Sequence, residues 1–290
     1  MYPSGRRLMN GEKIRRGLAP VSLLVMLVFG IWFGGLSSDV CAAPFDYAMY
    51  QQFLDRYVVA GKYIEGIKLN VVDYDAIHKD QEKRHSLYGN ILQQLAVFDP
   101  DMLQNREEEI AFWINTYNVG AIKMIIDHYS VDSIRSRKIN WLRNPWGIKI
   151  LTIGNNAYSL GQIEHEILIA KYKDPLIHFA IVCASLSCPD LSPQAYEGSQ
   201  LKEQLQRQAR QFLQNTKKGL RIRKEDGVVF FSQIFRFDKE SFPNGATDAI
   251  LLIAPFVDDK EDREFLMHPA QYTIKYLDYN WDLNTLSSVQ

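Results

Sequence analysis

The sequence shows no marked excess of charge, no internal repeat, no low-complexity tract and no linker. Lysine and arginine together number 33 against 34 aspartate and glutamate residues, so we expect no dense basic face. This balance argues against nucleic acid and anionic lipid as partners. Because apolar residues make up 47% of the chain and nothing divides it, we expect a full buried core in one domain, or at most two closely packed halves.

Cysteine is also scarce: the chain has three, and only Cys183 and Cys188 lie beyond the N-terminal segment. A disulfide between two cysteines so close in sequence is the simplest expectation for a protein outside the cytoplasm. A zinc site would need His165 and His178 as further ligands, and the C-x4-C spacing lacks the usual C-x2-C knuckle. We therefore predict no metal site and no cofactor.

The N-terminus has the composition of an export signal. Five basic residues precede an apolar stretch over 18–36, and small residues follow up to Ala43. This order predicts a signal peptide over 1–43, cleaved after Ala42 or Ala43, and a single domain over 44–290 in the periplasm or outside the cell. The alternative is an uncleaved membrane anchor, since a stretch of this length can just span a bilayer. Cleavage removes five basic and two acidic residues. It leaves 28 of the 33 lysine and arginine residues against 32 of the 34 aspartate and glutamate residues, so the mature protein is expected to be mildly acidic.

Hydrophobic periodicity predicts a mixture of helices and short strands. The expected helices cover 45–58, 79–97, 106–128, 159–172, 199–215, 246–256 and 258–267. The expected extended segments cover 67–72, 176–183 and 272–279, with hairpins around 154–156 and 225–227. Helices and strands do not alternate regularly, so we expect an α+β fold in which a small antiparallel sheet packs against a helical layer.

The segment 106–128 is predicted to be a buried helix, because its apolar residues leave almost no polar face. Trp113 lies in the middle of this helix and is expected to be buried. Asn115 and Asn118 follow on one side of it, and buried amides must find hydrogen-bond partners. Each of the two therefore either ties down a neighbouring loop or orients a catalytic group.

Two histidines and two cysteines lie close together after that helix. A thiol hydrolase needs a thiolate, a histidine that takes and returns the proton, and a carboxylate or amide that orients the histidine. On a strand over 176–183, His178 and Cys183 would point to opposite faces, so His178 is expected to be a core histidine. His165 projects from the preceding helix, which makes it the better base for Cys183. The residue that orients His165 stays open between the adjacent Glu164 and the two asparagines.

Several motifs resemble the domain-of-unknown-function family 547. They cover 111–118, 159–160, 163–165, 174–189, 231–237 and 279–284, within a span from about 45 to 284. The resemblance implies export, and it implies that Cys183 is kept while serine can replace Cys188, which favours Cys183 as the nucleophile and argues against a family-wide disulfide. The family is also similar to papain-like and transglutaminase-like thiol enzymes with the histidine before the cysteine, which implies a core of that type.

These observations predict an exported thiol-dependent hydrolase or acyl transferase that acts on a peptide or small amide in the cell envelope. Cys183 would attack the acyl carbon, His165 would carry the proton, and Glu164 or Asn115 would hold the imidazole. The side chains of Trp113 and Asn118 would line the cleft.

The alternative is a non-catalytic envelope protein with a binding or assembly role. In that case Cys183 and Cys188 form a disulfide or stay as buried thiols, and the motifs maintain the fold. A membrane contact is expected only through an uncleaved N-terminal segment.

Overall fold

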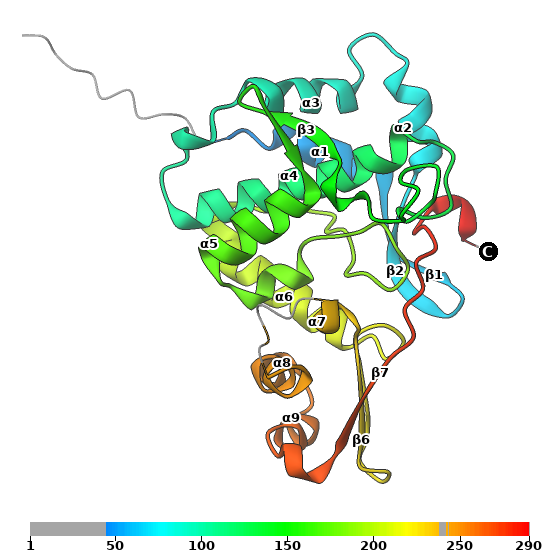
Figure 1. Ribbon diagram of the computed structural model, residues 1–290, viewed down its shortest axis with the longest axis vertical. Helices are drawn as coiled ribbons and strands as arrows, with labels where there is room; N and C mark the ends of the chain where they lie inside the picture. Colours follow the sequence, from blue (N-terminus) through cyan, green and yellow to red (C-terminus); the bar gives the residue numbers. More distant parts are fainter. Residues whose placement is uncertain (1–44, 238–241, 243, 290) are drawn as a thin grey trace, which may run out of the picture. The chain divides into compact units, whose positions relative to one another are not determined.

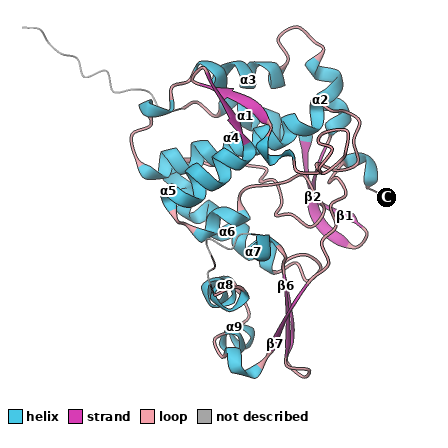
Figure 2. Cartoon of the chain, viewed as in Figure 1, coloured by secondary structure: helices cyan, strands magenta, loops and turns pink. Residues whose placement is uncertain are grey.

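The computed structural model describes residues 45–237, 242 and 244–289, all within the unit Ala42–Gln290. The predicted signal peptide over 1–43 lies outside these residues. No helix of the described part is long and apolar enough to cross a membrane. The α+β prediction is confirmed, because many helices accompany three small sheets of two or three strands each (Figure 2).

The first part of the fold is mainly helical. Its elements are α1 (Ala48–Tyr57), β1 (Val58–Ile64), β2 (Ile67–Val72), α2 (Tyr74–Gln81), α3 (Leu87–Val97) and α4 (Arg106–Ile126). The strands β1 and β2 form an antiparallel pair. The single helix predicted over 79–97 is wrong, because the chain breaks between α2 and α3. The Ser86 side chain accepts a hydrogen bond from the Gly89 N–H at 3.0 Å and so starts α3 as its N-cap.

Helix α4 is the centre of the main core, as the sequence predicts (Figure 1). The Asn105 side chain caps its N-terminus, and almost every residue from Ile110 onward is buried. Gly120 allows the next hairpin to approach closely. A Cβ atom there would lie 2.8 Å from Leu151 Cδ1 and 2.9 Å from Leu160 Cδ2, so a larger residue would force these two side chains to shift.

The middle of the chain carries the segments that form the site. Its elements are β3 (Lys149–Ile153), β4 (Asn156–Ser159), the π-helix η3 (Gln162–Ile169), α5 (Ala170–Tyr172) and the 3-10 helix η4 (Pro175–Phe179). The predicted hairpin is present as the antiparallel pair β3 and β4. A capping box precedes η3, because Ser159 Oγ accepts from the Gln162 N–H at 3.2 Å and Gln162 Oε1 accepts from the Ser159 N–H at 3.3 Å.

The strand predicted over 176–183 is wrong. Asp174 caps η4 through a hydrogen bond to the Leu176 N–H at 3.0 Å, and Pro175 occupies the first position of this 3-10 helix. Beyond η4 the chain runs as an irregular loop over 180–189, which we call the cysteine loop. An apolar run of this length does not by itself distinguish a strand from another buried segment.

The last part of the fold contributes most of a second buried cluster, which includes residues of α8. Its elements are α6 (Leu201–Leu213), β5 (Leu220–Arg223), β6 (Val228–Phe231), α7 (Ile234–Phe237), α8 (Ala246–Ile253), α9 (Lys260–Leu266) and β7 (Thr273–Tyr276). The strands β5 and β6 are antiparallel, whereas β7 joins β6 in parallel, so this sheet is mixed. In Figure 1, α8, α9, β6 and β7 lie at the opposite end of this unit from α1 to α3.

Short 3-10 helices connect these elements. They are η1 (Pro100–Met102), η2 (Pro145–Gly147), η5 (Gly198–Gln200), η6 (Ala254–Phe256), η7 (Pro269–Gln271) and η8 (Leu286–Ser288). After β7 the chain returns to the main core, where Leu283 pairs with Ser185 and Thr285 pairs with Val72. This return places the C-terminal segment against the cysteine loop.

Candidate active site

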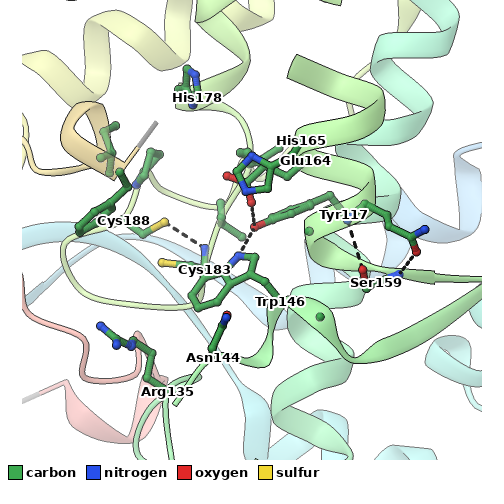
Figure 3. A pocket seen from close by; sticks show the side chains of 18 of the residues that line it. Tyr117, Arg135, Asn144, Trp146, Ser159, Glu164, His165, His178, Cys183 and Cys188 are labelled. Atoms are coloured by element: carbon green, nitrogen blue, oxygen red, sulfur yellow. Dashed lines mark hydrogen bonds between the residues drawn. The ribbon is translucent and has the colours of Figure 1, made fainter. Parts of the chain in front are cut away.

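A cavity of about 780 Å³ opens beside the cysteine loop (Figure 3). Five residues singled out in the sequence line it, namely Glu164, His165, His178, Cys183 and Cys188. The other lining residues include Tyr117 of α4, Arg135, Arg143, Asn144 and Trp146 of the segment before β3, and Phe237, Tyr279 and Trp281 from the C-terminal part. The cavity thus joins segments that are far apart in the sequence.

The cysteine loop is held by α4. The Asn118 side chain donates from Nδ2 to the Ala180 carbonyl oxygen and accepts at Oδ1 from the Val182 N–H, both at 3.0 Å. From the other side, the Asn284 N–H donates to the Ala184 carbonyl oxygen at 3.1 Å. Asn118 therefore holds a neighbouring loop in place, which is the first of the two roles predicted for it.

The residue after Cys183 has a strained backbone. Ala184 adopts a φ of 58°, in the left-handed region that costs a residue with a Cβ about 1–2 kcal/mol. Strain of this kind persists only where the surroundings impose it, and it concentrates at functional sites. Here the contacts to Asn118 and Asn284 on either side of Cys183 impose it.

Two hydroxyl groups lie beside the sulfur of Cys183. Its Sγ lies 3.2 Å from Ser185 Oγ and 3.3 Å from Tyr279 Oη, and its own N–H donates to Cys188 Sγ at 3.0 Å. Burial favours a higher pKa for Cys183, but hydrogen bonds from Cys188, Ser185 and Tyr279 outweigh it, so the pKa of Cys183 falls below its usual value. Both cysteines are free thiols.

The neighbouring groups keep their protons instead. Burial, together with the adjacent Cys183, raises the pKa of Cys188 well above its usual value. Burial likewise raises the pKa of Tyr279 far above its usual value, so its hydroxyl remains a donor. The first thiolate of the site therefore forms on Cys183.

Glu164 and His165 both reach the cavity from the π-helix η3 (Figure 3). The Tyr117 hydroxyl donates to Glu164 Oε2 at 2.9 Å and accepts from Trp146 Nε1 at 3.1 Å, which fixes the carboxylate. His165 is exposed to the cavity. π-Helical turns are rare and often occur at functional sites.

His178 also lines the cavity, although the sequence placed it on the face away from Cys183. That argument fails because it required a strand over 176–183. His178 is buried, and its ring lies 5.7 Å from that of Phe242. It is thus both a core histidine and a wall of the cavity.

Three predicted site residues do not line the cavity, namely Asn118, which holds the cysteine loop, Asn115 and Trp113. Asn115 donates from Nδ2 to the Tyr196 carbonyl oxygen at 2.8 Å and accepts from the Tyr196 N–H at 2.9 Å, so its amide holds another loop and does not orient His165. Trp113 is buried between Phe112 and Tyr158, with ring centres 5.2 and 5.4 Å away. It belongs to the core and is not part of the cleft wall.

Several residues of the cavity have a position there that the sequence analysis did not predict. Tyr117 was visible only as an apolar position of α4 within the motif 111–118, and Tyr279 and Trp281 only as part of a motif near the C-terminus. Arg135 belongs to no motif. Within 45–237, 242 and 244–289, no group of three His, Cys, Asp or Glu side chains is arranged to hold a metal ion.

Residues 100–213 match the family model described as "Protein of unknown function, DUF547". The resemblance is confirmed over this segment, which contains α4, η3 and the cysteine loop but not Tyr279 or Trp281. No curated protein and no solved structure matches the chain. The papain-like or transglutaminase-like core therefore stays a prediction.

Proposed function

We propose that this protein, a member of the DUF547 family, is a thiol-dependent hydrolase or acyl transferase with Cys183 as its nucleophile. The observation that carries the proposal is the sulfur of Cys183, which faces donors in a cavity also lined by a histidine and a carboxylate. These are the three groups that thiol catalysis requires. The substrate class that fits is a peptide or small amide.

The proposed reaction has two steps. The Cys183 thiolate attacks the acyl carbon, an S–C bond forms, and the leaving amine departs with a proton from His165. Water or an acceptor then gives a proton to His165 and attacks the thioester, which breaks the S–C bond and restores the thiolate. Glu164, fixed by Tyr117, holds the imidazole. In the free enzyme such catalytic hydrogen bonds are often long, and they shorten in the substrate complex.

The rate of Cys183 alkylation by iodoacetamide tests this proposal. Only the thiolate reacts, so a lowered pKa should place the midpoint of the pH–rate profile below about 8.5, the value of a free thiol. Tyr279→Phe removes a donor to the thiolate and should move the midpoint to higher pH. His165→Ala should slow labelling near pH 7 by about threefold to tenfold, because the proposed imidazolium partner of the thiolate is lost. Mass spectrometry of the native protein at each pH gives the rates.

Matched variants separate catalysis from structure. His268→Ala changes an exposed histidine outside the cavity and should leave the profile unchanged. Cys188→Ser keeps a hydroxyl donor and should slow labelling little. A Cys183–Cys188 bridge in the native protein, or no labelling before unfolding, would favour the non-catalytic binding or assembly protein. An unchanged rate in His165→Ala would remove His165 from the mechanism, and His178→Gln would then test the other histidine of the cavity.

Export is part of the same proposal, with the substrate in the cell envelope. The mature protein is expected to begin at Ala43 or Pro44, which keeps Phe45, whose ring packs against that of Phe112 at 5.1 Å. Intact-mass measurement of the protein from the periplasm or medium checks this. Soluble protein that retains residues 1–36 would contradict it.

A further inference from the structure

Arg135 presents a guanidinium group of fixed orientation to the cavity. Its Nε donates to the Arg143 carbonyl oxygen at 3.1 Å, and its Cζ lies 4.7 Å from the centre of the Trp281 ring. The turn that carries Arg135 is tied to the C-terminal segment. Ser133 Oγ accepts from the Arg135 N–H at 3.2 Å and donates to the Trp281 carbonyl oxygen at 2.8 Å. None of these contacts uses the two Nη groups.

Arg135 lacks an acidic partner within the described part of the chain. No carboxylate there forms an ion pair with Arg135 or with Arg143, although both arginines line the cavity. In the view of Figure 3, Arg135 lies on one side of Cys183, and Glu164 and His165 lie on the other. The nucleophile therefore has a basic wall on one side and the proton-transfer groups on the other.

We infer that Arg135 binds a carboxylate of the substrate, so that the substrate is a peptide or amide with a free carboxylate near the carbonyl that Cys183 attacks. This inference rests on the proposed function and adds the substrate class to it. The planar guanidinium matches a carboxylate through two parallel hydrogen bonds. Trp146 and Trp281, whose ring centres lie 6.1 Å apart, provide an apolar wall for the part of the substrate next to that carboxylate.

The test compares two alkylating reagents of nearly equal shape. Iodoacetate carries a carboxylate and iodoacetamide does not, and both react with the thiolate, so the ratio of their rates cancels any change in thiolate population. For Cys183 the rate with iodoacetate divided by the rate with iodoacetamide should exceed the same ratio for a small neutral thiol by about fivefold. An exposed charge pair at short range can provide a preference of this size. Arg135→Gln should abolish the excess. Raising the salt concentration should reduce it in the unaltered protein as well, which tests the inference without a variant.

A matched control is Arg137→Gln. Arg137 is also stacked on a tryptophan, with its Cζ 5.0 Å from the Trp141 ring centre, but it lies outside the cavity and should leave the ratio unchanged. Succinate at constant ionic strength should slow iodoacetate more than inorganic phosphate does, and the reverse order would overturn the assignment to a carboxylate. Labelling by iodoacetamide with no preference for iodoacetate would overturn this inference alone. If neither reagent labels Cys183 in the native protein, both the proposed enzymatic function and this inference are contradicted.

Discussion

Trp113→Ala is expected to lower the free energy of unfolding by about 3–5 kcal/mol. The indole is 6% exposed and packs between Phe112 and Tyr158 on the central helix α4. Its removal leaves a cavity that the surrounding rings of the core can fill only in part, so the lost burial and the remaining void both contribute. Urea unfolding followed by circular dichroism measures the change.

The control for this prediction is Trp141→Ala. Trp141 is 74% exposed, and its ring contact is with the guanidinium of Arg137, so the loss should stay within about 0.5 kcal/mol. A Trp113→Ala variant within about 1 kcal/mol of the unaltered protein would contradict the central position of α4 in the core.

The elements that the sequence predicts well are those stabilised by neighbours along the chain. Helix α4 follows from its continuous apolar character and the β3–β4 hairpin from its turn residues. The capping box of Ser159 and Gln162 joins residues three apart, so its pattern is visible locally. The break at Ser86 was also local, but the prediction placed the charged segment 79–85 before it in the same helix as the apolar stripe after it.

Another failure concerns a segment held in part by distant residues. The segment 176–183 looks like a strand by composition. In the structure its backbone at Ala180 and Val182 is hydrogen-bonded to the Asn118 side chain, and the carbonyl oxygen of Ala184 accepts from the Asn284 N–H. Both asparagines are far from this segment in sequence. The π-helical turn of η3 has no periodicity signal, because nothing in the order Glu164-His165 distinguishes it from an α-helix. The sequence therefore could not tell that both side chains face one cavity.

The residues of the candidate site also divide into those that could be predicted from the sequence and those that could not. Residue types with characteristic chemistry, such as Cys183 and His165, could be chosen from the sequence because thiol catalysis requires a cysteine and a general base. Tyr279 and Arg135 could not, because a tyrosine or an arginine acquires its role only from what lies beside it. In this protein those neighbours are the sulfur of Cys183 and the ring of Trp281.

Asn118→Ala is expected to cost about 2–5 kcal/mol, because it leaves the Ala180 carbonyl oxygen and the Val182 N–H buried without their partner. The same change should release the cysteine loop from α4. Cys183 would then lose the fixed positions of Ser185 and Tyr279 around its sulfur, and the midpoint of its alkylation profile should rise toward about 8.5.

Asn115→Ala supplies the matched comparison, three positions earlier on α4. It also removes two hydrogen bonds to buried backbone, those to the Tyr196 carbonyl oxygen and N–H, so its cost in unfolding free energy should be similar. The loop that it holds lies outside the cavity, and the alkylation profile of Cys183 should not move. Equal shifts of the profile in both variants would mean that general loosening of the fold controls the thiol. A shift in Asn118→Ala alone would assign that control to the amide that holds the cysteine loop.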